Sequence, residues 1–71
     1  MITKRACELE VGDLLDLEGD PYADPRRDIK ALAETLAEVM EIMRPVPQLV
    51  LVYFRRNVVG FPPGHQLRVE Q

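Results

Sequence analysis

The residues of this chain that could form a nucleophile–base pair are a single cysteine and a single histidine, Cys7 and His65. A thiol activated by an imidazole can carry covalent catalysis, but the site also needs donors that stabilise an oxyanion. No glycine-rich element accompanies Cys7, and a lone cysteine more often behaves as a small buried hydrophobe. The sequence contains no serine, which excludes a serine-based triad. We therefore predict that the chain is not an enzyme.

Acidic residues gather between positions 16 and 28, where a calcium loop is the chemistry to consider. Counted from Asp16, carboxylates occupy the first, third and fifth positions, as an EF-hand requires. Pro21 stands at the sixth position instead of glycine, and Arg27 at the twelfth instead of glutamate. The remaining carboxylates have no aromatic-lined pocket around them. We therefore expect a solvated acidic loop rich in Pro and Gly at 18–32, with no metal and no cofactor.

The size and composition of the chain limit the fold that can position these groups. Its 71 residues are 46% hydrophobic and 30% charged, which is typical of a single globular domain (1–71) with a marginal core. Residues 1–6 are expected to form a flexible lead-in. No apolar run approaches the length of a membrane span, and no signal peptide is recognisable. With one thiol and no export signal, we expect a cytoplasmic protein.

Three apolar runs near the C-terminus predict strands. They lie at 49–54, 58–61 and 66–70, separated by a turn at 55–57 and a Pro-Pro-Gly corner at 62–64. A further strand is expected within 6–17, and the connector 45–47 is expected to be extended because proline fixes φ. Alternation along these strands predicts a buried core with eight members: Leu15, Leu17, Val50, Val52, Phe54, Phe61, Leu67 and Val69.

The segment 28–43 has two interpretations. Its apolar residues recur at helical spacing, Asp28 could cap its start, and Pro45 would stop it. On this pattern the fold is an antiparallel sheet of four strands covered by one helix. The other interpretation makes 33–43 a long strand that pairs with 49–54, because pairing can override propensity differences of tenths of a kcal/mol per residue.

Three stretches of the sequence, LEVGDLLDLEGDPYADP, LAEVMEI and VLVYFRRNVVGFPPGHQLRV, resemble small uncharacterised proteins of actinobacterial bacteriophages. The ending GFPPGHQLRV is also similar to the way SH3-type barrels close. The resemblance implies a mainly β fold, a five-stranded SH3-like small barrel with 33–43 as its long second strand. It implies no activity, and it suggests a bacterial host protein as the partner. We favour the barrel over the sheet with one helix.

The function that the sequence favours is a non-catalytic protein-binding module or adaptor. In strand 49–54 alternate side chains must leave the core, which predicts an outward stripe that runs towards two arginines. His65 is expected to be exposed at its corner, with a local hydrogen bond, an interface contact or a pH-sensitive switch as its possible roles. The predicted partner-binding residues are Leu49, Leu51, Tyr53, Arg55, Arg56, Tyr22 and His65.

The alternative function is a nucleic-acid-binding barrel. Arg55, Arg56, Arg68 and Lys4 would then meet phosphates while Tyr53 or Phe54 stacked on bases. The net charge of −3 and the presence of only four aromatic residues disfavour this function. Self-association into a homo-oligomer is a further alternative for the outward stripe, and no membrane partner is expected.

Overall fold

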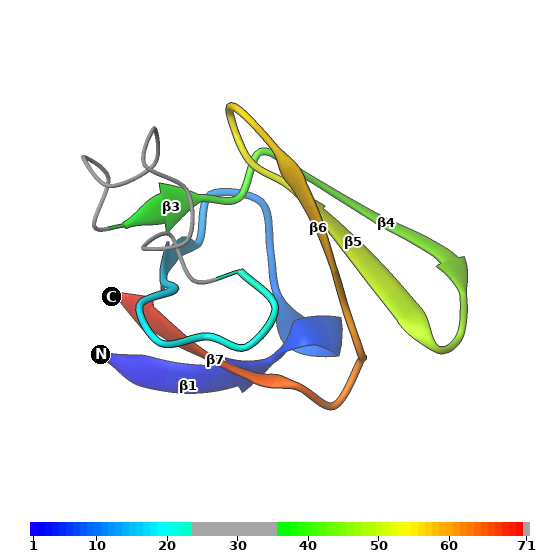
Figure 1. Cartoon of the computed structure of the whole chain (residues 1–71), viewed down its shortest axis with the longest axis horizontal. Helices are drawn as coiled ribbons and strands as arrows, with labels where there is room; N and C mark the ends of the chain where they lie inside the picture. Colours follow the sequence, from blue (N-terminus) through cyan, green and yellow to red (C-terminus); the bar gives the residue numbers. More distant parts are fainter. Residues whose placement is uncertain (24–35, 71) are drawn as a thin grey trace.

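The computed structural model describes residues 1–23 and 36–70, and within them the chain is mainly β (Figure 1). Two antiparallel sheets form, with strand orders β1-β7-β2-β3 and β4-β5-β6. A short 3-10 helix, η1, follows the first strand. The elements are β1 (Ile2–Arg5), η1 (Ala6–Glu8), β2 (Leu14–Asp16), β3 (Ala37–Glu38), β4 (Glu41–Val46), β5 (Leu49–Tyr53), β6 (Val58–Phe61) and β7 (Gln66–Glu70).

The first sheet is built around β7, which lies between β1 and β2. β1 pairs antiparallel with β7 from Ile2 opposite Val69 to Arg5 opposite Gln66, so the N-terminus lies beside the end of β7 (Figure 1). The prediction of a flexible lead-in at 1–6 is therefore wrong for 2–5. With one apolar residue, this stretch has too weak a pattern to identify a strand. Its order comes from ladder bonds to a partner more than 60 residues away.

The second sheet consists of two hairpins that share β5. The strand predicted at 49–54 is β5, which ends at Tyr53, and the strand predicted at 58–61 is β6. The turn between them is closed by the Phe54 N–H, which donates to the Asn57 carbonyl at 2.8 Å. The connector expected at 45–47 instead divides between the end of β4 and a two-residue turn, with an irregularity in the ladder between Met43 and Val46.

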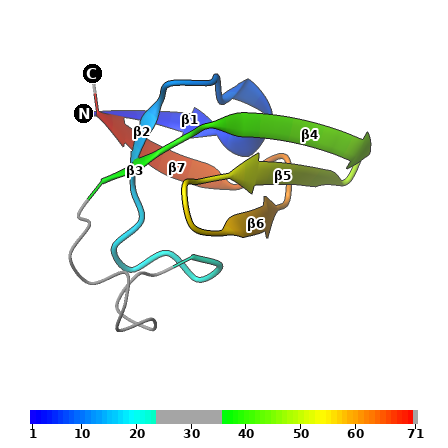
Figure 2. The same ribbon diagram turned by 90° about the horizontal axis from the view of Figure 1, so that it is seen from above.

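The middle segment is extended over its described part. Val39 exchanges backbone hydrogen bonds with the turn before β2, donating to Asp13 at 2.9 Å and accepting from Gly12 at 2.8 Å. The next residue, Met40, donates to the Tyr53 carbonyl at 2.8 Å, so this stretch passes from the first sheet to the second (Figure 2). The helix considered for 28–43 is therefore wrong over 36–43, and its part at 28–35 lies outside the described residues. Backbone pairing on both sides outweighs the small helical preference of the sequence.

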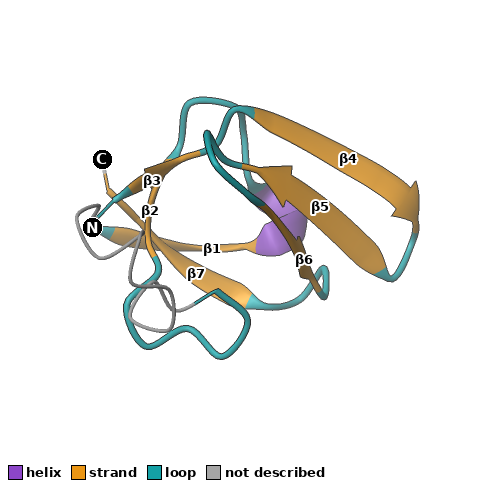
Figure 3. Ribbon diagram, turned by 45° about the horizontal axis from the view of Figure 1, so that its top comes forward, coloured by secondary structure: helices purple, strands orange, loops and turns teal. Residues whose placement is uncertain are grey.

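The two sheets face each other across the core but do not close into a barrel (Figure 3). Among the described residues, no ladder connects β6 to β1. Seven of the eight predicted core residues are buried, and Phe54 is the exception, since it follows the end of β5 and is only partly buried. The core also contains residues that the sequence did not indicate. It comprises Ala6, Leu9, Leu15, Leu17, Val39, Val50, Val52, Phe61, Leu67 and Val69.

Candidate functional site

Strand β5 separates a buried face from an outer face. Val50 and Val52 are 2% and 0% exposed, so they point into the core, as predicted. Leu49, Leu51 and Tyr53 alternate with them and are half-buried. Because successive side chains of a strand point to opposite sides, these three form a stripe on the outside of the second sheet.

The stripe continues onto both neighbouring strands. Met43 lies opposite Leu51, and Val46 lies opposite Leu49 on β4, while Val58 lies opposite Tyr53 on β6. Directly opposed residues of antiparallel strands share a face. Met43, Val46 and Val58 are 47%, 48% and 49% exposed, respectively. We call this set the outer face: Met43, Val46, Leu49, Leu51, Tyr53 and Val58.

Gly60 shapes the outer face. It pairs with Leu51, and a Cβ atom at its position would lie 3.0 Å from Leu49 Cδ1 and 3.5 Å from Leu51 Cδ2. Both leucine side chains therefore lie over the glycine, where a larger residue would displace them. A glycine inside a strand often marks such close packing. It explains why the two leucines are half-buried although none of the described residues forms a layer above them.

Charged residues mark one end of the outer face. Arg55 and Arg56 form the β5–β6 turn, and both are exposed. Arg55 Nη2 lies 3.8 Å from Glu38 Oε1, with 71% of the arginine side chain exposed. The described residues offer Arg56 no ion pair. Glu41 lies opposite Tyr53, and it is the acidic residue among the β4 residues that pair with the stripe on β5. The apolar stripe therefore ends at a cationic tip.

The other two predicted site residues lie in a separate cluster. The His65 ring stacks on Phe61 with centroids 5.5 Å apart, and Tyr22 meets it edge-on at 4.8 Å. His65 Nε2 lies 2.7 Å from Asp20 Oδ2, and only 18% of the histidine side chain is exposed. The prediction of an exposed His65 is therefore wrong. Phe61 provides an apolar platform for the ring, and an aspartate 45 positions away provides its partner.

The loop at 18–23 is fixed by the same aspartate. Asp20 Oδ1 accepts the backbone N–H groups of Tyr22 at 2.8 Å and Ala23 at 3.2 Å, which is an Asx-type turn. An Asp-Pro pair at 20–21 is a recognisable signal for such a turn, but not for a contact with His65. Residues 18–23 form no helix or strand, as expected, and 24–32 of the predicted loop lie outside the described residues.

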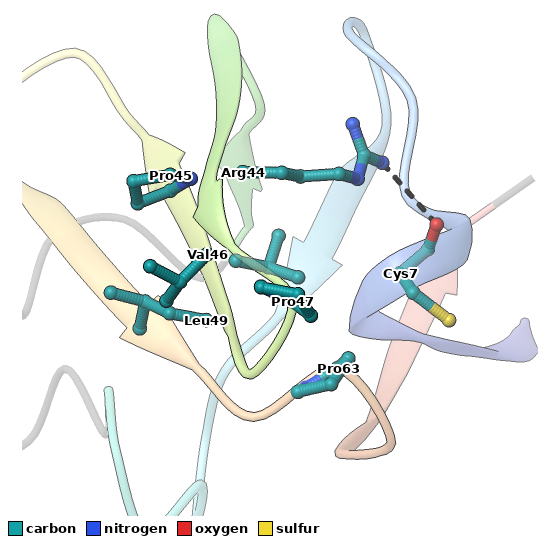
Figure 4. Close-up of a pocket in the computed structure, with 8 residues that line it drawn as sticks. Cys7, Arg44, Pro45, Val46, Pro47, Leu49 and Pro63 are labelled. Carbon is teal, nitrogen blue, oxygen red and sulfur yellow. Dashed lines mark hydrogen bonds between the residues drawn. The ribbon is translucent and has the colours of Figure 1, made fainter.

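A shallow groove lies between the β4–β5 turn and the segment that carries Cys7 (Figure 4). Its cavity measures about 260 Å³, and Pro45, Pro47 and Pro63 contribute to its walls. Arg44 crosses its end and donates to the Cys7 carbonyl at 3.2 Å. His65 Nε2 is bonded to Asp20, and the described residues show no hydrogen bond between the Cys7 thiol and the imidazole.

The basic residues considered for nucleic-acid binding are divided between the two sheets. Lys4 on β1 pairs with Asp13 at 3.1 Å, and Arg68 on β7 lies 3.5 Å from Asp16. Arg68 also donates to the Glu18 carbonyl. Of these four residues, Arg55 and Arg56 lie beside Tyr53, in the turn after β5. Phosphate contacts by Lys4 or Arg68 would therefore compete with existing carboxylate partners.

Comparisons of this chain with protein-family models, with curated proteins and with solved structures find no match. The resemblance to actinobacteriophage proteins therefore stays a prediction. Within the described residues, no helix has the length and apolar character needed to cross a membrane. The same residues contain no group of three or more His, Cys, Asp or Glu side chains arranged to hold a metal ion.

Proposed function

We propose that this chain is a non-catalytic protein-binding module that docks its partner on the outer face. The observation that supports this proposal is an apolar surface continuous over three strands, with Met43, Val46 and Val58 each close to half exposed. Small soluble proteins rarely leave a contiguous apolar patch without a function. None of the described residues forms a layer over it.

The charges around the outer face indicate the chemistry of the partner. Arg55 and Arg56 stand at one end, and arginine next to apolar and aromatic side chains is typical of binding surfaces. A protein segment with apolar side chains followed by Asp or Glu would complement this arrangement. Glu41 lies opposite Tyr53 at this same end, on β4, and disfavours partner acids on the β4 side. The partner's carboxylates are therefore expected beside Arg55 and Arg56, on the β6 side of that end.

The resemblance to actinobacteriophage proteins extends the proposal to the setting. It implies that the partner is a bacterial host protein and that docking occurs in the host cytoplasm. It also implies an SH3-like arrangement, which the topology supports if β3 and β4 are counted as two halves of one bent strand. The order is then β7-β2-β3/β4-β5-β6, with β1 added at the edge beside β7.

The proposal can be tested by selecting binders from a random peptide display library. The selected peptides are expected to place Asp or Glu beside apolar residues. The double variant Leu51→Glu with Tyr53→Glu should fold but bind them at least 100-fold more weakly, because it introduces two charges into the stripe. A matched control is Val11→Glu, which changes a 66% exposed valine outside the outer face and should bind normally.

A charge-reversed tip separates the apolar and the ionic contributions. Arg55→Glu with Arg56→Glu should weaken acidic peptides roughly tenfold and leave neutral peptides unaffected. The proposal fails if peptides bind the Leu51→Glu/Tyr53→Glu variant as they bind the natural sequence. If light scattering instead shows a dimer that this double variant dissociates, the outer face belongs to a second copy of the chain.

A further inference from the structure

The open sheet edges in the described part of the chain differ in how they are protected from strand addition. β1 carries Lys4 and Arg5, and β3 is only two residues long. β4 includes Pro45 between charged and exposed residues. Charges, proline and brevity are the common devices that block an edge. β6, with the sequence Val-Val-Gly-Phe, has none of these devices except modest length.

Two hydrogen bonds fix the direction of the backbone groups at the end of β5. The Tyr53 carbonyl accepts from Met40, so Tyr53 directs its backbone polar groups towards the β4 side. The Phe54 N–H donates to the Asn57 carbonyl, so Phe54 directs its groups towards the β6 side. In an antiparallel pair the hydrogen-bonded and non-hydrogen-bonded positions alternate. Tyr53 and Leu51 are therefore non-hydrogen-bonded positions with respect to β6.

The residues opposite these positions on β6 are Val58 and Gly60. Their N–H and C=O groups consequently point away from β5, towards the open edge. β6 has β5 as its one neighbour in the described sheet, and Val58 is 49% exposed. Two donors and two acceptors are thus presented in a row, beginning beside the arginine tip.

From this edge we infer that β6 receives an extended segment of the partner as an added strand. This inference rests on the proposed function and specifies how the partner binds. Strand addition satisfies the outward groups of Val58 and Gly60 through main-chain bonds, while alternate partner side chains extend the outer face. Phe61, whose ring meets the Tyr22 ring edge-on at 6.1 Å, lies at the end of β6 away from the arginine tip.

The partner segment is therefore short, β-branched or aromatic at alternate positions, and acidic where it passes Arg55 and Arg56. The opposite side of the added strand would not meet the core, so polar residues are expected there. A helical partner would bring apolar side chains to the outer face but would leave the outward backbone groups of Val58 and Gly60 unpaired. The inference excludes that mode.

Amide hydrogen exchange of the intact chain with a selected peptide tests the inference without a mutation. On peptide addition, exchange at the Val58 and Gly60 amides should slow at least tenfold, whereas Val59, already in the ladder to β5, should change little. Peptides N-methylated at alternate amides should lose at least tenfold in affinity only at positions whose N–H faces β6. Unchanged exchange at both amides, with the peptide bound, would overturn strand addition.

Substitution at Val58 provides a second test. Val58→Pro removes an outward N–H without removing a ladder bond, and Val58→Ala removes the side chain but keeps the N–H. Strand addition predicts binding at least tenfold weaker for the proline than for the alanine variant, with both folded by circular dichroism. Equal binding by the two, combined with loss of binding in Leu51→Glu/Tyr53→Glu, would reject strand addition and retain the docking face. Edge pairing between two copies would appear as a dimer lost in Val58→Pro, which also contradicts the inference.

Discussion

Replacing each phenylalanine by alanine should separate the core of this domain from its rim. Phe61 is 0% exposed, and its ring also contacts Tyr22 edge-on and stacks on His65. Removing a buried phenylalanine side chain costs about 3 to 5 kcal/mol, and aromatic contacts contribute about 0.5 to 1.5 kcal/mol each. We expect the loss of stability in Phe61→Ala to lie near the upper end of the first range, at about 5 kcal/mol. A chain of this length is stable by roughly 4 to 11 kcal/mol, so the substitution is expected to remove between about half and all of the free energy of unfolding.

Phe54 provides a matched comparison, since it is the same residue type two strand positions beyond the buried Val52. It is only partly buried, although it contacts the core cluster. Burial of a whole phenylalanine side chain contributes about 1.5 to 3 kcal/mol by transfer, and partial burial gives roughly 1 to 2 kcal/mol. Phe54→Ala should therefore remain folded, with a melting temperature lowered by roughly 4 to 16 °C.

The measurement is urea unfolding followed by far-UV circular dichroism, with thermal melts of the same samples. The slope of free energy against urea should match that of the natural chain for Phe54→Ala, so that a shifted midpoint reports stability alone. If Phe54→Ala proves as destabilising as Phe61→Ala, or more so, the assignment of Phe61 to the centre of the core is wrong.

Three further outcomes follow from individual residues. Gly12 has φ +95°, so Gly12→Ala should cost about 1 to 2 kcal/mol in urea unfolding, whereas Gly64→Ala, with open space around it and no positive φ, should be neutral or slightly stabilising. Asp13→Ala removes a carboxylate that pairs with the β1 lysine at 3.1 Å and caps its own turn, and it should lower stability by about 1 to 2 kcal/mol. The backbone N–H of Arg5, and after it the Arg5 side chain, lowers the pKa of the Glu8 carboxyl. The stabilisation that results is present above the pKa of Glu8 in the unfolded chain and is lost as the pH falls through its pKa in the folded chain. Glu8→Gln should therefore flatten the acid limb of a curve of stability against pH.

The strands nearest the C-terminus could be predicted because their signals are local. Residues 58–61 and 66–70 are apolar or alternating runs bounded by Asn, Pro and Gly, and they match β6 and β7. In the same way, alternation identifies the inward side chains of β5 and β7. Phe54 was the one error in the predicted core, because the period of a strand does not indicate where the strand ends relative to the sheet above it.

Segments whose structure depends on distant partners were harder to predict. β1 contains one apolar residue and takes its form from β7, while Val39 and Met40 are extended because backbone groups of both sheets bond to them. The sequence around Val39 and Met40 alone favours a helix, by tenths of a kcal/mol per residue. His65 was misplaced for a related reason, since its partner Asp20 lies 45 positions earlier in the chain, with the described strands β3, β4, β5 and β6 between them.

The candidate site shows the same division. The stripe Leu49, Leu51 and Tyr53 follows from alternation alone, but its width does not, because Met43 and Val58 join it only through the registers of β4 and β6. Gly60 has a different meaning in the sequence and in the folded sheet. In the sequence it weakens a strand, and in the sheet it makes room for the two leucines and directs its own polar groups to an unprotected edge. A residue that stabilises neither strand nor core therefore lies where the apolar face and the open edge meet, and this is the position at which an added strand would pair most closely.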